Sequence, residues 1–196
     1  MRFRERPFTD WPNILTCSRF FLSAVFVFFL LQHSSASKVL ALAVFLLASF
    51  TDYWDGYLAR RGGRVTGFGR LMDPIADKIL TLSAFLAFAF LGLIPLWMAI
   101  AVLLRDFLVT GLRLRLPPDD PAQAARKSGK QKTVLQMALI FVALLFLAAR
   151  DYGLCGEVLE AKLLVFIRYL MLFTVLVTWW SGARYLWANK KHLGIR

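Results

Sequence analysis

Long apolar stretches separated by short polar segments dominate the chain. Six such stretches cover residues 12–32, 38–60, 68–92, 95–115, 131–150 and 158–189. About 20 consecutive apolar residues allow an α-helix to cross the hydrocarbon core of a bilayer. The polar breaks between them are short, the longest being residues 117–129. The pattern therefore predicts an all-α integral membrane protein, with six transmembrane helices in one domain that covers residues 1–196.

The composition argues against a water-soluble protein. Hydrophobic residues make up 59% of the 196 positions, and the mean hydropathy is +0.60, whereas soluble domains average about 45–50% apolar residues. The six predicted helices leave room for loops and short ends but not for a soluble domain. No small-residue cleavage site is evident before Gln32, so we expect the first helix to be retained rather than removed as a signal peptide.

Basic residues predict the orientation of the helices. The net charge is +12, from 24 Lys and Arg against 12 Asp and Glu. In a membrane protein such an excess marks the cytoplasmic side and attraction to anionic headgroups, so we expect no nucleic-acid partner. One side collects Arg2, Arg4, Arg6, Arg60, Arg61, Arg64, Arg70, Arg113, Arg115, Arg126, Lys127, Lys130, Lys132, Arg184, Lys190, Lys191 and Arg196. The opposite side has Lys38, Arg150 and Lys162.

This asymmetry places both termini and the longest loop in the cytoplasm, and the protein in the cytoplasmic (inner) membrane. Residues 1–11 alternate arginine with Phe3, Phe8 and Trp11. Such a segment is typical of chain that lies along the headgroup region, so a short N-terminal interfacial segment is predicted.

Four aspartates interrupt the apolar pattern at the predicted cytoplasmic ends of the second and third helices. The two groups consist of Asp52, Asp55, Gly56 and Ala59, and of Gly69, Asp73 and Asp77. Spacings of three and four put the members of each group on one helix face. Ionisable residues within a membrane span are costly, and they mark a functional site by default.

The residue types in these groups indicate a site for hard metal ions. The only histidines, His33 and His192, lie elsewhere in the chain, and an all-oxygen cluster suits Mg²⁺, Mn²⁺ or Ca²⁺. Two divalent ions bridged by shared carboxylates would clamp a diphosphate, and the small residues would let a base or phosphate approach the backbone. The alternative is a set of interhelical ion pairs with Arg60, Arg70, Lys78 or Arg105. Pairing explains neither the four acids on two stripes nor the aligned small residues.

The segment from Asp52 through Asp55, Gly56 and Ala59 to Arg60, followed after eight residues by Gly69 to Asp73 and Asp77, resembles the full signature of the CDP-alcohol phosphotransferase family. This resemblance implies a homodimer that holds two divalent cations, Mg²⁺ or Mn²⁺, on the signature acids. It also implies transfer of a substituted phosphoryl group from a CDP-linked donor to an alcohol, with release of CMP.

The resemblance assigns roles to residues by their position in the signature. The metal ligands are Asp52, Asp55, Asp73 and Asp77, with Asp52 and Asp73 shared between both ions. Asp77 also matches the general base for the acceptor hydroxyl. The positions that match contacts to the CDP donor are Asn13, Thr16, Gly56, Ala59, Arg60, Thr66 and Gly69. Two of these residues could have a structural role instead of a donor contact. Thr66 could be an ordinary loop hydroxyl, and Asn13 could be the N-cap of the first helix.

Other segments resemble one subgroup of this family, the bacterial phosphatidylglycerophosphate synthases. They are residues 12–16 with Arg19, the pairs Arg105-Asp106 and Leu112-Arg113, and residues 129–133 with Gln136. This resemblance implies CDP-diacylglycerol as donor and glycerol 3-phosphate as acceptor. The phosphate of that acceptor needs cations beyond the metals, and the residues expected to bind it are Arg105, Arg113, Lys130 and Lys132. The alternative for Lys130 and Lys132 is that they lie beside lipid headgroups and serve only to set the orientation of the protein in the membrane.

Two departures from the subgroup keep other reactions open. Asp106 stands where the subgroup usually has glutamate, which is closer to cardiolipin synthases that use phosphatidylglycerol as acceptor, and residues 112–118 also depart from its pattern. Phosphatidylinositol phosphate synthase is a third possibility. A cation or solute carrier is the alternative from another class, but the acids gather at one membrane face. No polar stripe continues from them to the other face, with the exception of Arg168, midway along the sixth stretch. Either an interhelical partner or a lipid phosphate would explain Arg168.

Overall fold

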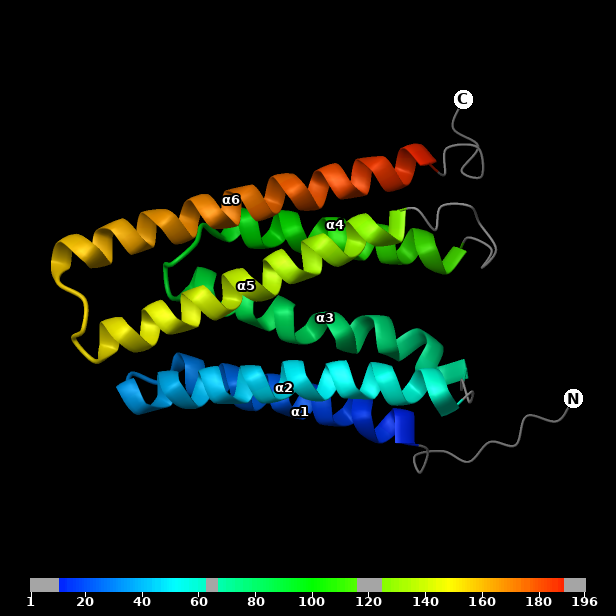
Figure 1. The fold of residues 1–196 in the computed structure, drawn as a ribbon, viewed down its shortest axis with the longest axis horizontal. Helices are drawn as coiled ribbons and strands as arrows, with labels where there is room; N and C mark the ends of the chain where they lie inside the picture. The colour runs from blue at the N-terminus through cyan, green and yellow to red at the C-terminus, as the bar shows by residue number, and fades with distance from the viewer. Residues whose placement is uncertain (1–10, 63–66, 116–124, 189–196) are drawn as a thin grey trace, which may run out of the picture. The chain divides into compact units, whose positions relative to one another are not determined.

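The computed structural model of the protein is all-helical where it describes the chain (Figure 1). It describes the backbone of residues 11–62, 67–115 and 125–188, and the side chains of residues 18–51, 78–112 and 132–188. The helices in these ranges are α1 (Trp11–Leu31), α2 (Ser35–Gly62), α3 (Gly67–Phe90), α4 (Leu96–Arg115), α5 (Ala125–Asp151) and α6 (Glu157–Ala188). Each coincides with one predicted apolar stretch, so the prediction of an all-α chain with six helices is confirmed.

Two helix boundaries differ from the prediction. α2 continues to Gly62, inside the predicted break at residues 61–64, and α5 begins at Ala125, inside the predicted break at residues 117–129. Alanine, arginine, lysine and glutamine are good helix formers, but charged residues lower the hydropathy on which the prediction rested. Apolar patterning therefore located the apolar parts of these helices rather than their ends.

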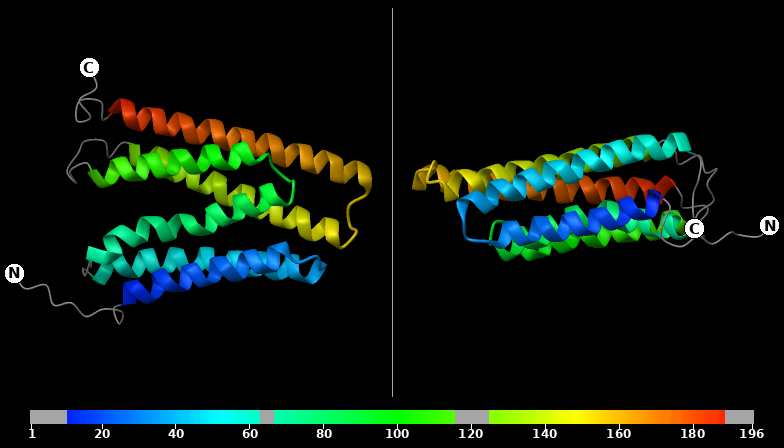
Figure 2. Two further views of the ribbon diagram at one scale, coloured as in Figure 1. Left: turned by 180° about the vertical axis from the view of Figure 1, so that it is seen from behind. Right: turned by 90° about the horizontal axis from the view of Figure 1, so that it is seen from below.

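The chain divides into two compact units, residues 1–84 and residues 85–196. In the first unit α1 and α2 lie side by side (Figure 2). Phe26 of α1 and Phe45 of α2 are buried, and their ring centroids are 6.0 Å apart at an interplanar angle of 46°. Ala41 and Ala48 are also buried on α2, so small and aromatic side chains share the packed face of this helix.

Lys38 caps the C-terminal end of α1 in the first unit. Its side chain is buried, and Nζ donates to the carbonyl oxygens of Leu30 at 2.6 Å and Gln32 at 2.7 Å. The last carbonyls of a helix have no partners within the helix, and a lysine can bind them. One of the three basic residues on the predicted non-cytoplasmic side therefore serves as a helix cap.

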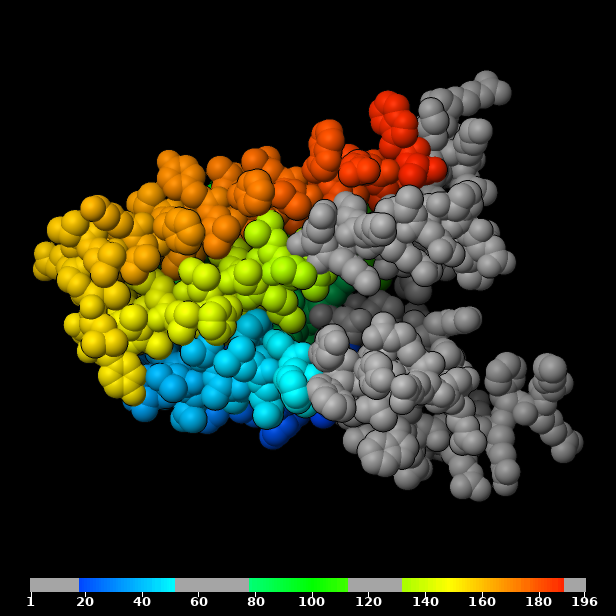
Figure 3. All heavy atoms as spheres, in the orientation of Figure 1, coloured from blue at the N-terminus to red at the C-terminus, as the bar shows by residue number. Residues whose placement is uncertain are grey.

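In the second unit α6 packs against both α4 and α5. Buried residues recur at helical spacing, among them Val102 of α4, Leu144 of α5, and Ile167 and Met171 of α6. The opposite face of α6 carries large apolar side chains that are exposed, namely Tyr169, Phe173, Leu176, Trp180 and Trp187. In Figure 3 the side chains of α6 stand along an open edge of this unit.

Two helical segments are long and apolar enough to cross a membrane, within the part of the chain whose side chains are described. They are Lys132–Asp151 and Glu157–Ala188, and in the second only 28% of the most apolar window is buried. A core helix of a soluble protein would bury most of such a surface. Three shorter apolar segments belong to α1, α2 and α3. These are features of a membrane protein.

Candidate functional site

The four signature aspartates all lie on helices. Asp52 and Asp55 belong to α2, and Asp73 and Asp77 belong to α3. Asp52 lies ten residues before the end of α2, and Asp77 lies ten residues after the start of α3. With a rise of about 1.5 Å per residue, each lies about 15 Å along its own helix from the polar segment 63–66. Helical backbone at these positions supports the prediction that each aspartate pair shares one helix face.

The donor set on α2 and α3 fits a hard divalent cation. Between Asp52 and Asp77 the sequence contains no histidine and no cysteine, and carboxylate oxygens are the ligands that Mg²⁺ and Mn²⁺ prefer. The four aspartate side chains lie outside the described ones, so their role as ligands stays a prediction. Elsewhere, among the side chains that are described, no group of three His, Cys, Asp or Glu residues gathers.

The residues predicted to contact the CDP donor are also distributed over the first unit. Asn13 and Thr16 are in the first turns of α1, while Gly56, Ala59 and Arg60 are near the end of α2 and Gly69 is at the start of α3. Their side chains lie outside the described ranges, and Thr66 lies outside the described residues altogether. Their contacts with a donor remain predictions.

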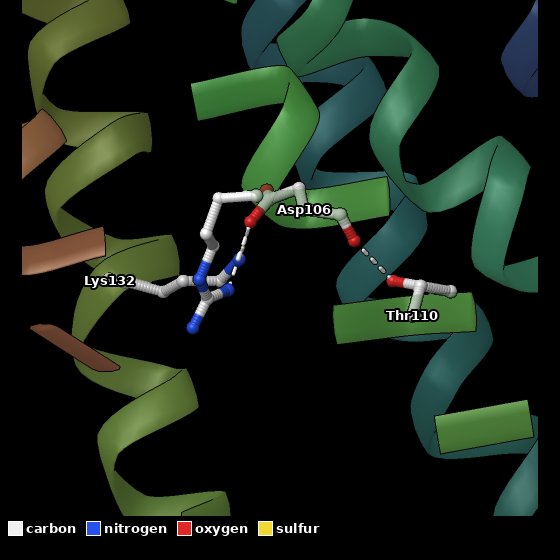
Figure 4. Close-up of polar contacts among 4 residues, drawn as sticks. Asp106, Thr110 and Lys132 are labelled. Atoms are coloured by element: carbon white, nitrogen blue, oxygen red, sulfur yellow. Dashed lines mark hydrogen bonds and ion pairs between the residues drawn. The ribbon is translucent and has the colours of Figure 1, made fainter. Parts of the chain in front are cut away.

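Two of the four cations predicted to bind the acceptor phosphate contact one residue of the second unit, Asp106 of α4. Arg105 Nη1 donates to Asp106 Oδ1 at 3.0 Å, and Lys132 Nζ of α5 contacts the same oxygen (Figure 4). The exposed fractions of the three side chains are 5%, 11% and 12% for Arg105, Asp106 and Lys132. Thr110 Oγ1 donates to the backbone oxygen of Asp106 at 2.7 Å. We call Arg105, Asp106 and Lys132 the basic cluster.

The other two predicted cations lie on the same helices. Arg113 is near the end of α4 and Lys130 is on α5, and their side chains lie outside the described ranges. Successive helical residues are about 100° apart around the axis, so Lys130 and Lys132 occupy different faces of α5. That all four cations bind one phosphate therefore remains a prediction.

Two members of this region carry more than sequence reasoning assigned to them. The sequence marks Asp106 as part of a pair that resembles the subgroup and as a departure from its usual glutamate, and the structure adds that it pairs with both cations. Gly182 of α6 had not been singled out, and a Cβ added there would lie 2.9 Å from Arg105 Nε. The sequence signal for Gly182 was the spacing of four that relates Thr174, Thr178 and Gly182 within an apolar helix, and the structure buries both threonines.

Arg168 has an internal partner, which decides between the two explanations left open by the sequence. Its Nε donates to the carbonyl oxygen of Leu93 and its Nη2 to that of Gly92, both at 3.2 Å. Gly92 has a φ of +74°, and the Leu93 N–H donates to Phe88 O at 3.0 Å, which ends α3 in a left-handed turn. Glycine adopts this conformation without strain. Arg168 thus binds the turn between α3 and α4.

The match to a known family covers nearly the whole chain. The sequence profile of the family described as CDP-alcohol phosphatidyltransferase matches residues 10–185, a range that includes the signature aspartates and the basic cluster. The chain belongs to this family of enzymes, which confirms the family that the signature predicts.

Individual relatives agree with this assignment. The chain is 31% identical over 181 residues to the CDP-diacylglycerol–glycerol-3-phosphate 3-phosphatidyltransferase of Rickettsia felis, covering 92% of this chain and 96% of the relative. It is 35% identical over 146 residues to the enzyme of the same name from Bacillus subtilis, covering 68% and 76% of the two chains. It is 38% identical over 156 residues to a probable phosphatidylglycerophosphate synthase of Mycobacterium tuberculosis, covering 78% and 74%.

Proposed function

We propose that the protein transfers the phosphatidyl group of CDP-diacylglycerol to glycerol 3-phosphate, which gives phosphatidylglycerophosphate and CMP. The observation that carries this proposal is the similarity to relatives named for this reaction, one of which covers 92% of the chain. The aspartates on α2 and α3 and the basic cluster supply the two kinds of group that the reaction needs, acids for metal ions and cations for an anionic acceptor.

The signature aspartates would bind the metal ions and move one proton. Asp52, Asp55, Asp73 and Asp77 would hold two divalent cations, Mg²⁺ or Mn²⁺, with Asp52 and Asp73 shared. When bound, the cations neutralise the diphosphate of the donor and make CMP a better leaving group. Asp77 takes the proton from the acceptor hydroxyl. The freed oxygen attacks the phosphorus that bears diacylglycerol, and the bond from that phosphorus to CMP breaks.

The donor would lie against the small residues of the same helices. Glycine and alanine at positions 56, 59 and 69 leave room for the nucleotide near the backbone, where larger side chains would block it. Arg60 would contact the diphosphate, because a guanidinium binds phosphate oxygens in pairs. Asn13, Thr16 and Thr66 would complete the donor contacts.

The acceptor phosphate would be bound by cations of the second unit. The basic cluster contains two cations and one carboxylate, a formal charge of +1, and its side chains are only 5–12% exposed. Attraction for an anion is stronger at such a site than in bulk water. Arg113 and Lys130 would add to this charge from α4 and α5. Cardiolipin synthesis, with phosphatidylglycerol as acceptor, is the alternative that the Arg105-Asp106 pair leaves open.

The proposed topology is six membrane spans in one domain, with both termini in the cytoplasm and the protein in the inner membrane as a homodimer. The described structure adds support for the charge asymmetry. Lys38 is buried against helix carbonyls, and Arg150 pairs with Asp151 at 3.0 Å and Glu160 at 4.0 Å. Two of the three basic residues on the non-cytoplasmic side are therefore engaged within the protein.

Offering acceptors one at a time tests the reaction. Purified protein in mixed micelles receives CDP-diacylglycerol and Mg²⁺, and then glycerol 3-phosphate, phosphatidylglycerol or inositol 1-phosphate, while the lipid product and CMP are followed. We expect phosphatidylglycerophosphate with the first acceptor. Turnover with phosphatidylglycerol alone would transfer the assignment to cardiolipin synthase. Uptake of cations into vesicles without release of CMP would contradict the assignment as an enzyme.

A further inference from the structure

In the second unit one carboxylate contacts two cations, one of them buried and the other partly buried. Asp106 Oδ1 accepts a hydrogen bond from Arg105 Nη1 at 3.0 Å, and Lys132 Nζ contacts the same oxygen. The two cations come from α4 and α5, and Figure 4 shows Lys132 reaching Asp106 across the space between these helices. The three formal charges add to +1, and the three side chains are only 5–12% exposed.

Stability by itself is a weak reason to keep such a cluster. Removing charges from water costs free energy that their mutual attraction barely returns, and apolar side chains of similar volume are often equally stable. The positions of the two cations along their helices suggest instead that the cluster takes part in the reaction. Lys132 lies seven residues after the start of α5 and Arg105 ten residues before the end of α4. Lys132 is thus in the half of α5 nearest the polar segment 116–124, whereas Arg105 lies at the middle of α4.

We propose that Asp106 is a positioning residue, which holds Arg105 and Lys132 in the orientation that binds the phosphate of the acceptor. This inference rests on the proposed function, which assigns both cations to that phosphate. A guanidinium has five N–H donors and an ammonium has three, and Asp106 Oδ1 accepts one from each. Cations ordered before binding lose less conformational entropy when the phosphate arrives.

Because Gly182 of α6 has no side chain, the Arg105 side chain can pack against the backbone of α6. A Cβ at this position would lie 2.9 Å from Arg105 Nε and 3.3 Å from its Cγ, so any larger residue forces the arginine to move. Arg105 Nε is buried and has no hydrogen-bond partner among the described residues. The guanidinium is therefore held by Asp106 at one end and by the glycine surface at the other.

Steady-state kinetics of the purified full-length protein test the role of Asp106. We expect Asp106→Ala to raise the KM for glycerol 3-phosphate about tenfold, equivalent to ~1.4 kcal/mol, while the KM for CDP-diacylglycerol changes less than twofold. Asp106→Glu keeps the charge and should bring the KM back to within about threefold of the parent value. If Asp106→Ala does not accumulate as folded protein, Asp106→Asn has nearly the same shape without the charge and should raise this KM about threefold.

A second ion pair in the chain provides a matched control. Arg150 Nε donates to Asp151 Oδ1 at 3.0 Å, again between neighbours in sequence, at the far end of α5. Asp151→Ala should leave both KM values unchanged. An unchanged or lower KM for glycerol 3-phosphate in the folded Asp106 variants would overturn the proposal, because a carboxylate that merely competes with the phosphate would lower this KM on removal. An equal rise in both KM values would also overturn it.

The steric part of the proposal has its own pair of variants. Gly182→Ala should displace Arg105 and raise the KM for glycerol 3-phosphate about threefold to tenfold. Gly111→Ala on α4 is the control, because a Cβ there meets no atom within 4 Å. Equal KM values for the two variants would contradict the role of Gly182. Failure of the parent protein to use glycerol 3-phosphate would instead contradict the proposed function itself, so the two failures are distinguishable.

Discussion

Arg168 Nε donates to the carbonyl oxygen of Leu93 at 3.2 Å, so a charged residue in the longest apolar helix binds the turn between α3 and α4. The two residues are 75 positions apart in the sequence. With Nη2 on Gly92, the guanidinium binds two carbonyls of the turn that follows α3, which lie outside the helix. A cation within an apolar helix, which by default indicates a transport path or a ligand, here has a structural partner.

Replacing Arg168 should lower stability without changing substrate affinity. Arg168→Leu removes both hydrogen bonds, and because one of them is exposed we expect a loss of about 2 kcal/mol in the free energy of unfolding. Thermal unfolding in detergent micelles, followed by tryptophan fluorescence, measures this loss. Arg168→Lys should restore part of it, and Lys162→Leu, which removes a charge from the same helix, is the control. A parent-like unfolding temperature for Arg168→Leu would show that the cap contributes little.

Removal of divalent metal should abolish CMP release. A chelator should stop the reaction, and Mg²⁺ or Mn²⁺ should restore it, because CMP leaves poorly from the donor unless the negative charge of the diphosphate is neutralised. Asp52→Asn and Asp73→Asn, which lose the shared ligands, should be inactive although folded. Asp77→Asn should lower kcat by ~10²–10⁴-fold through loss of the base, with a smaller effect on donor affinity.

Asp151→Asn is the control for these substitutions. Asp151 is the last residue of α5, lies outside the signature, and pairs with Arg150. It should keep the activity of the parent protein. Full activity of Asp52→Asn or Asp73→Asn at saturating metal would remove these aspartates from the site.

Cations on α4 and α5 should act on the acceptor more than on the donor. A charge-assisted hydrogen bond to a buried anion contributes about 1.5–3 kcal/mol, which corresponds to ~10–150-fold in affinity. Arg113→Ala and Lys130→Ala should therefore raise the KM for glycerol 3-phosphate by factors in this range, and the KM for CDP-diacylglycerol by much less. Lys162→Ala, on the predicted opposite side of the membrane, should change neither. Equal effects on both substrates would indicate a general loss of structure.

Labelling of cysteines can test the topology directly. Cys155 is a free thiol of intermediate exposure in the turn between α5 and α6. In a Cys17→Ser background, a membrane-impermeant maleimide added to intact cells should label Cys155. A cysteine introduced by Lys190→Cys, in protein that also carries Cys155→Ser, should react only after the cells are permeabilised. The reverse pattern would place the termini outside the cytoplasm.

The sequence alone determined the helices and the family. Apolar runs longer than a bilayer crossing located all six helices, since hydrophobic length and periodicity are local properties of the chain. The signature from Asp52 to Asp77 also lies within 26 consecutive residues, so its spacing is readable without a structure. Helix ends were less predictable, as the start of α5 at Ala125 shows, because polar helix formers do not register as membrane-spanning chain.

Only the tertiary structure decided what the buried charges do. Lys132 meets Asp106 across 26 positions, Arg168 meets Leu93 across 75, and Gly182 faces Arg105 from another helix. The apolar pattern marked Arg168 as an exception, and the family resemblance singled out Arg105 and Lys132, but neither could supply their partners. A periodic pattern places a residue on a face and says nothing of which helix covers it. The fold of the second unit makes those pairings. For Arg105 and Lys132, whose side chains are 5% and 12% exposed, burial also makes a partner necessary, since a charge removed from water needs one within the protein.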